Sequence, residues 1–134
     1  MFVNSVAEVV ENAVKIARYH RCRGGVICFD NAFHGRTLLI LTLTSKVHPY
    51  KSPARPGARH LPGAFPYCHR CPWGLEYPRC REPCGEAYFE EDFFTRQVDL
   101  AEVAAVILEP VQGRGLNHPA KTEALGRRLR EKPL

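Results

Sequence analysis

The sequence predicts an α/β domain, in which helices flank a mostly parallel sheet. Its 134 residues are 45% hydrophobic and 25% charged, which suits one globular domain. A helical pattern over residues 3–18 is followed by the short apolar run VICF, and this pairing of helix and buried strand is typical of α/β proteins. A second apolar run, AAVIL, ends at a glutamate and a proline, which is typical of a buried parallel strand.

The first predicted helix, residues 3–18, reads VNSVAEVVENAVKIAR. Asn4 and Ser5 are the candidate N-caps, and Ser5 forms a capping box with Glu8 three residues later. Such a helix start is a common phosphate site, because free N–H groups and the positive end of the helix dipole meet there, although most capped helices bind nothing. One face is expected to be buried, with apolar residues at helical spacing: Val6, Val9, Val10, Ala13, Val14 and Ala17.

The first predicted strand, residues 26–29, leads directly into the segment NAFHGRT. Phe33 and His34 therefore stand at the carboxyl end of a strand, where parallel sheets bind ligands. On the residues alone, packing is the alternative role for both side chains. Residues 38–44, LLILTLT, fit either a strand or a buried helix, because a short apolar run has no decisive period.

A long proline- and cysteine-rich loop is expected over residues 48–85, because its many prolines and glycines exclude long regular elements. Four cysteines in it follow the spacing C-x2-C-x8-C-x3-C and could hold a tetrahedral zinc ion. A proline-pinned loop with incidental thiols is the alternative. The residues concerned are Cys68, Cys71, Cys80 and Cys84.

The second half repeats the alternation of helix and strand. A helix is expected over residues 86–96, with Phe89 and Phe93 on one side, followed by a turn at residues 100–103. Residues 104–108 are expected to be a central strand buried on both faces, and a turn follows at residues 111–115. A last helix over residues 119–132 would bury Leu125 and Leu129 and present a basic outer face. Since two or three strands cannot close a large parallel sheet, the chain is interpreted as part of one domain, residues 1–134.

The charge pattern does not favour nucleic acid. The net charge is +5, but the arginines are spread along the chain and not gathered in one block with aromatics, so a solvated surface is expected. No apolar run approaches the roughly 20 residues of a membrane helix, and no secretory leader is visible. A cytoplasmic location without membrane or nucleic-acid partners is therefore expected.

Three segments resemble, in order, the motifs of class III aminotransferases, which depend on pyridoxal 5′-phosphate (PLP). VNSVAEVVENAVKIAR is similar to the family's F-x-N-S-G-A-E helix, FDNAFHGRTLL to its A-F/Y-H-G-R-T segment, and ILEPVQGRG to its E-P-V/I-Q-G-E-G segment. The cysteine-bearing stretch resembles a loop of the 4-aminobutyrate aminotransferase branch, which makes zinc less expected. The resemblance implies a truncated PLP-transferase large domain, and it implies that residues 38–44 form a helix.

The resemblance also implies roles for particular residues. Ser5, Val6 and Ala7 match the positions that bind the cofactor phosphate, which suits a helix N-terminus. Phe33 matches the aromatic residue that lies against the cofactor ring, beside His34, and Glu109 matches the glutamate that lines the site. These residues are the candidate cofactor-binding set.

Two departures from the family pattern weaken the match. Val6 stands where the family has a glycine that allows close backbone approach, and Arg114 stands where it has a glutamate that helps to partner a substrate-binding arginine. The chain also ends before the family's aspartate at the pyridine nitrogen and before its cofactor-bearing lysine. No catalytic residue is therefore assigned, because no lysine present matches that context: Lys15, Lys46, Lys51, Lys121 and Lys132.

The expected function is that of an aminotransferase-derived chain. The family moves an amino group from 4-aminobutyrate or another ω-amino acid to a 2-oxo acid, and its members are homodimers. This chain is expected to be inactive alone. The alternatives are a small zinc-stabilised basic binding module and a non-functional gene remnant.

Overall fold

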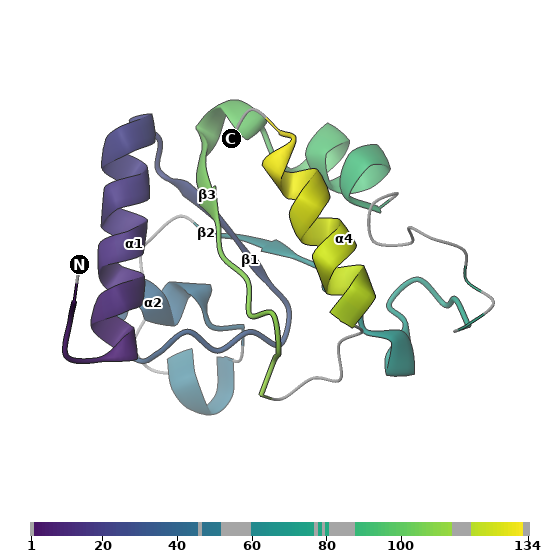
Figure 1. Ribbon diagram of the computed structural model, residues 1–134, viewed down its shortest axis with the longest axis horizontal. Helices are drawn as coiled ribbons and strands as arrows, with labels where there is room; N and C mark the ends of the chain where they lie inside the picture. The colour runs from purple at the N-terminus through teal and green to yellow at the C-terminus, as the bar shows by residue number, and fades with distance from the viewer. Residues whose placement is uncertain are drawn as a thin grey trace.

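The computed structural model describes residues 2–45, 47–51, 60–76, 78, 80, 88–113 and 119–132. It confirms the α/β class, with helices on both faces of a parallel sheet (Figure 1). The main elements are α1 (Val6–Arg21), β1 (Gly25–Phe29), α2 (Leu38–Leu43), β2 (His60–Gly63), β3 (Val103–Val106) and α4 (Pro119–Arg130). Short helical segments lie at Val47–Lys51, Cys68–Arg70, Phe89–Gln97 and Leu100–Glu102.

The sheet has the order β2-β1-β3, and both pairings are parallel. Every residue of the central strand β1 is buried. Val26 pairs with His60 of β2 and with Ala105 of β3, and the register shifts by one residue next to Gly25. A Cβ at Gly25 would lie 2.8 Å from the carbonyl oxygen of Glu102, so the approach of β3 requires glycine there.

The strands differ from the sequence prediction in two respects. The apolar run at residues 104–108 was expected to form a central strand, but β3 lies at an edge of the described sheet, and Ala105 and Val106 are only half-buried. β2 arises inside the segment expected to be a loop. Its four residues include Pro62, which an edge strand tolerates because only one side of the strand pairs.

Helix α1 has the predicted capping residue, although it begins and ends three residues later than the predicted range 3–18. Its N-cap Ser5 accepts a hydrogen bond from the Glu8 N–H at 3.2 Å. The Glu8 carboxylate accepts in return from the Asn4 N–H at 2.7 Å, one residue before the expected box position. The helix ends at Cys22, which has a left-handed φ of 53°.

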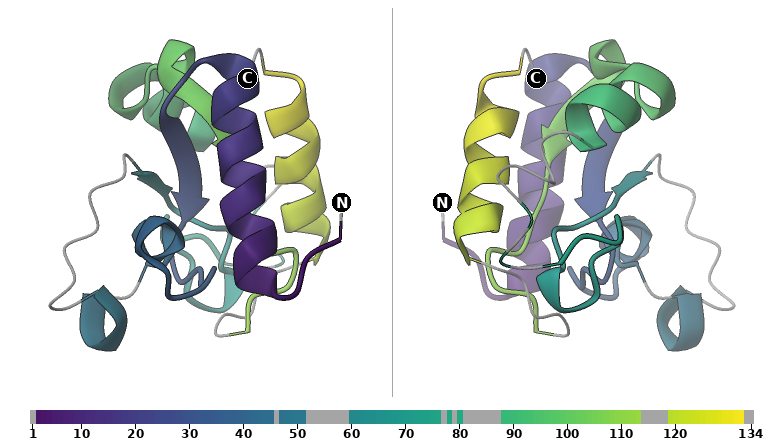
Figure 2. Two further views of the ribbon diagram at one scale, coloured as in Figure 1. Left: turned by 90° about the vertical axis from the view of Figure 1, so that its left-hand side faces the viewer. Right: turned by 90° about the vertical axis from the view of Figure 1, so that its right-hand side faces the viewer.

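The predicted buried face of α1 is wrong in part. Val14 is the buried residue of the helix, whereas Val6 and Val9 are 76% and 51% exposed and Ala13 is also exposed. The physical reason is the width of the support, because α1 rests on a narrow surface of three short strands and α2. In the view from the side of α1, β1 and β2 lie to one side of this helix and not beneath it (Figure 2).

The two faces of β1 build two separate cores. On one face Val26 and Cys28 pack with Val14 of α1 and Leu43 of α2. Residues 38–43 are thus helical, as the resemblance implied. On the other face the core includes Ile27, Phe29, Phe65, Phe89, Phe93, Val98, Val103, Leu125 and Leu129. The predicted inward positions of Phe89, Phe93, Leu125 and Leu129 are therefore confirmed.

Every helix among the described residues is too short or too polar to cross a lipid bilayer.

Candidate functional site

The candidate site lies where β1 and β3 end, at the carboxyl edge of the sheet. Beyond β1 the Asp30 N–H donates to the Gly63 carbonyl at 3.0 Å, and Asn31 turns the chain with a left-handed φ of 63°, which asparagine tolerates. The buried Gln112 side chain donates to the Asp30 carbonyl at 3.0 Å from the segment after β3. These bonds hold the ends of all three strands together.

Phe33 and Glu109, two of the predicted site residues, meet directly. The Phe33 N–H donates to the Glu109 carboxylate at 3.1 Å, although 76 positions separate them in the sequence. Each follows a strand of the same parallel sheet, and adjacent parallel strands deliver their carboxyl ends to one edge. The sheet therefore brings the two motifs into contact.

The start of α1 lies next to the turn that carries Phe33, residues 31–37. Gly35 has a φ of +138°, and a Cβ at this position would lie 3.9 Å from the Cβ of Ala7 and 2.1 Å from a methyl carbon of Ile40. The Thr37 hydroxyl donates to the Glu11 carboxylate of α1. The predicted phosphate-binding turn, Ser5 to Ala7, is thus adjacent to the turn that carries Phe33.

A cavity of about 290 Å³ opens at this edge, near the lower end of the roughly 300–1,000 Å³ of small-molecule sites. Phe33 is 36% exposed, and its ring centroid lies 5.2 Å from that of Tyr50. The Arg36 guanidinium lies over the Tyr50 ring, 5.6 Å from its centroid. The described lining residues are Asn31, Phe33, Arg36, Tyr50, Glu109 and Gly113.

His34 occupies a different position from its neighbour. It is 7% exposed, is not among the described residues that line the cavity, and its Nε2 has no hydrogen-bond partner within the described residues. Burial lowers the pKa of the imidazole below its ordinary value, so the neutral form is favoured. A cofactor contact for His34 stays a prediction, as it does for Ser5, Val6 and Ala7.

Arg36 and Tyr50 were missed by the sequence reasoning. Arg36 is the cationic side chain among the described lining residues. Its signal was available, since it follows the H-G pair in a polar segment after a buried strand. Tyr50 had no such signal in the sequence, because it lies in the proline-rich stretch and only the fold brings it to Phe33. The neighbouring Lys51 donates to the Thr42 carbonyl at 3.2 Å.

The residues present fit a phosphorylated pyridine ring. The half-exposed Phe33 ring offers a flat wall, and the N–H groups at the very start of α1, before the Glu8 N–H that the Ser5 side chain caps, lack intrahelical acceptors. Among described non-glycine residues only Cys22 and Asn31 have positive φ, so Val6 keeps an ordinary backbone in place of the family's glycine. Its side chain can still restrict close approach. Arg114, the second departure, lies outside the described residues.

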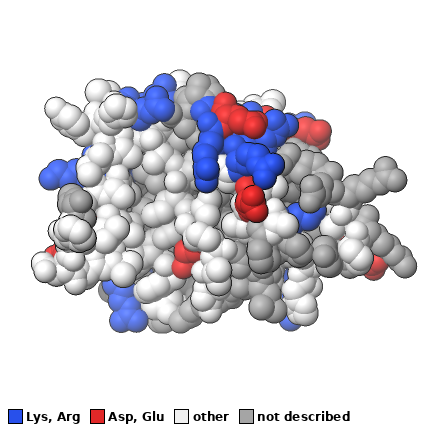
Figure 3. Space-filling model, viewed as in Figure 1, with Lys and Arg blue, Asp and Glu red and all other residues white. Residues whose placement is uncertain are grey.

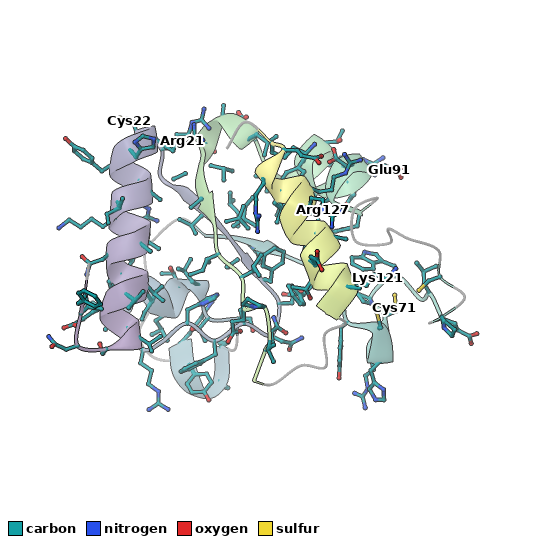
Figure 4. All side chains as sticks on the ribbon, viewed as in Figure 1. Arg21, Cys22, Cys71, Glu91, Lys121 and Arg127 are labelled. Carbon is teal, nitrogen blue, oxygen red and sulfur yellow. The ribbon has the colours of Figure 1, made fainter. Side chains whose placement is uncertain are left out.

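The cysteines give no described metal centre. Cys68, Cys71 and Cys80 are half-buried, and Cys84 lies outside the described residues, so the four-cysteine hypothesis stays untested. No three potential metal-ligand side chains come together among the residues that the structure describes. Cys71 lies near the N-terminal end of α4, far from α1 in this view (Figure 4).

Two other surface features lie away from the Phe33 site. A larger hollow of about 780 Å³ lies between β3 and α4. Its lining is mixed, because the apolar Val106 and Leu129 stand beside the charged Arg21, Glu123 and Arg130. Basic side chains gather near the C-terminal end of α4 with acidic side chains among them (Figure 3). Arg127 pairs there with Glu123 at 3.2 Å, as expected for a solvated face.

Comparison with known proteins identifies the relatives of this fold. The family model for class-III aminotransferases matches residues 1–131. A probable 4-aminobutyrate aminotransferase of Bacillus subtilis (strain 168) is 44% identical over 118 residues, which cover 86% of this chain and 26% of that protein. A 5-aminovalerate aminotransferase of Pseudomonas aeruginosa is 41% identical over 115 residues, covering 86% and 25%. The 2-aminoadipate transaminase of Pseudomonas putida is 42% identical over 133 residues, covering 95% and 29%.

Solved structures agree with these sequences. An S-selective transaminase from Arthrobacter sp. superposes with a TM-score of 0.70 at 21% identity, over 96% of this chain and 30% of that one, which bears on the fold alone. Lysine aminotransferase from M. tuberculosis gives a TM-score of 0.64 at 25% identity, over 97% and 32%. The chain therefore spans less than a third of the length of these relatives.

Proposed function

Since the chain belongs to the class III aminotransferase family, we propose that it forms the phosphate-binding and ring-binding wall of a PLP-dependent transaminase site. The observation that carries the proposal is the contact between Phe33 and Glu109 beside the first turn of α1. It joins three motifs that are distant in sequence at one edge of the sheet. In this proposal the cofactor, when bound, supplies the electron sink for amino-group transfer.

Each residue of the proposed wall has a distinct task. The N–H groups at Val6 and Ala7, next to Ser5, hold the phosphate by hydrogen bonds and by the helix dipole. The Phe33 ring stacks on the pyridine ring. Glu109 holds the Phe33 backbone at 3.1 Å and so orients that ring, and its carboxylate adds polar lining to the cavity.

The proposed substrates are an amino acid donor and a 2-oxo acid, both of which carry a carboxylate. Arg36 is placed to bind that group, because it is the cation among the described lining residues of the cavity. The relatives carry the names of 4-aminobutyrate and 5-aminovalerate aminotransferases, which favours an ω-amino acid donor. Substitution of Arg36 by alanine should weaken binding of a short dicarboxylate, such as glutarate, and the lysine variant should restore part of it.

We further propose that the 134-residue polypeptide alone does not catalyse transamination. No lysine in it has the context of the family's cofactor-bearing lysine, and the described Lys51 is bonded to the Thr42 carbonyl. Turnover of 4-aminobutyrate and 2-oxoglutarate by the purified chain with PLP would contradict this. The homodimer and the cytoplasmic location stay predictions, which ultracentrifugation and cell fractionation test.

The cofactor wall is tested with pyridoxine 5′-phosphate, which has the ring and phosphate of PLP without the aldehyde that reacts with any lysine. Calorimetric titration should give one site, which Phe33→Ala weakens at least about tenfold through loss of stacking, a change of about 1.4 kcal/mol. Arg127→Ala, on the outer face of α4, is the matched control and should bind as the wild type does. Equal affinities of the wild type, Phe33→Ala and Arg127→Ala for pyridoxine 5′-phosphate would refute the proposed ring-binding role of Phe33.

The departure at Val6 has its own test. Val6→Gly, in a chain completed with the missing part of the family domain, should tighten PLP binding because the phosphate can then approach the backbone more closely. Unchanged or weaker binding would show that the phosphate site is wrongly placed.

A further inference from the structure

The Phe33 turn is fixed from a position that no motif assigned. Thr44 caps the C-terminus of α2 and is 1% exposed. Its hydroxyl accepts from the His34 N–H at 3.2 Å. It lies 3.2 Å from the Gly35 carbonyl oxygen and 3.5 Å from that of Ile40, and the shorter distance favours donation to Gly35. One hydroxyl therefore satisfies the backbone on both sides of the His34–Gly35 peptide.

The next residue extends this clamp. The Ser45 N–H donates to the Ala32 carbonyl at 3.0 Å, and Glu109 holds the Phe33 N–H from the other side. The backbone around Phe33 is thus bonded at consecutive peptide groups. These bonds restrain the backbone of Phe33 and therefore the region that its ring can reach.

The backbone conformation of Gly35 is the reason that this turn needs hydrogen bonds from a side chain. Its φ of +138° is a conformation that L side chains rarely adopt, and the neighbouring Ile40 methyl leaves no room for a Cβ. A glycine in such a turn also has the most conformational freedom to lose on folding. The buried threonine hydroxyl offsets that freedom with two hydrogen bonds.

We propose that Thr44 is a positioning residue of the site, which sets the placement of the Phe33 ring relative to Arg36. The two residues flank the His34–Gly35 peptide that Thr44 holds, and both line the cavity. The inference rests on the proposed function, because it takes Phe33 and Arg36 as the ring wall and the carboxylate-binding group. Thr44 itself is not among the described lining residues and acts through the turn.

Thr42 provides a matched control on the same helix. It is also 1% exposed, but its hydroxyl donates to the Leu39 carbonyl within α2. Thr44→Val and Thr42→Val therefore remove the same group from equally buried positions, and only the first leaves the His34 N–H without its acceptor. Thr44→Ser keeps the hydroxyl and should restore what Thr44→Val loses.

Two measurements test the proposal. Amide hydrogen exchange at His34, measured by NMR on the ligand-free chain, should be at least about tenfold faster in Thr44→Val and near wild type in Thr44→Ser and Thr42→Val. Pyridoxine 5′-phosphate, titrated at a temperature where every variant is folded, should bind at least about tenfold more weakly to Thr44→Val alone. Rescue by serine separates positioning from simple destabilisation.

Each outcome decides the matter. An unchanged His34 exchange rate in Thr44→Val, or equal losses of binding in Thr44→Val and Thr42→Val, would overturn the positioning role. If the wild-type chain does not bind the probe although His34 exchange responds as expected, the proposed function fails, and Thr44 is then a residue of the fold and not of a site.

Discussion

The two faces of the sheet differ in what fills them. One face is covered by the Phe89–Gln97 segment and α4, and its rings pack edge to face, with Phe29 and Phe89 centroids 5.7 Å apart and Phe89 and Phe93 5.0 Å apart. The other face, under α1 and α2, has a buried core of small and medium side chains: Val14, Val26, Cys28 and Leu43.

The difference separates stability from binding. Burial of aromatic side chains concentrates apolar area, and therefore stabilisation, on the first face. The second face has a smaller apolar core, beside which hydrogen bonds fix the turn that carries Phe33 and Arg36, and α1 leaves Val6 and Val9 exposed there. A site at a sheet edge needs side chains that stay exposed to a ligand, as Phe33 does. A fully packed aromatic core could not provide them.

The largest expected effect comes from the aromatic face. Phe89→Ala should lower the free energy of unfolding by about 3–5 kcal/mol, because a buried ring is replaced by a cavity. Val14→Ala on the opposite face should cost only about 1–2 kcal/mol, since it removes two methyl groups. Urea denaturation of both variants measures the difference, and equal losses would remove the contrast between the faces.

A smaller loss of stability is expected from a substitution in the turn that carries Phe33. Gly35→Ala should cost about 2–4 kcal/mol, since a Cβ there would lie 2.1 Å from Ile40 at a φ of +138°. Gly24→Ala is the control, because nothing lies within 4 Å of its Cβ position, and it should stay within about 0.5 kcal/mol of wild type. A thermal melt in which both variants match wild type would show that the turn can relax.

A loss of stability at high pH is expected from the buried thiol of Cys28, on the face of the sheet under α1 and α2. Burial raises the pKa of Cys28 from 9.0 to about 11, so between these values the unfolded chain loses a proton that the folded chain keeps. Unfolding is thereby favoured as pH rises, by roughly 2–3 kcal/mol once pH 11 is reached. Denaturant titrations at pH 8 and 10.5 should show the loss in wild type and a smaller one in Cys28→Ala. Identical pH slopes would contradict it.

The smallest effect is expected at low pH from His34. Burial lowers its pKa below 6.5, so the unfolded state binds a proton that the folded state refuses. The stability that His34 contributes is present above pH 6.5 and falls as the pH drops through the lowered folded-state pKa. His34→Gln should flatten the stability profile between pH 7 and 5 relative to wild type. A wild-type profile no steeper than that of the variant would place the imidazole in contact with water.

Sequence patterns predicted local elements better than their partners. Ser5 and the spacing of the valines located α1, and Phe89 with Phe93 located a buried helical segment, because both signals depend on neighbours within four positions. The buried face that the same valines predicted is wrong in part, since burial depends on how much sheet lies beneath the helix. β2 escaped prediction because Pro62 reads as a breaker until the strand is known to lie at an edge.

For the candidate site, the sequence determined which motifs are present and in what order, which was sufficient to indicate the family and to select Phe33 and Glu109. Only the tertiary structure decided that these two residues touch, that Tyr50 and Arg36 share their cavity, and that Thr44 holds the turn between them. The physical reason is the separation along the sequence of the residues that interact. Capping and periodicity are set by residues a few positions apart, whereas the site is assembled by parallel strand pairing between segments up to 79 positions apart, as Val26 and Ala105 are.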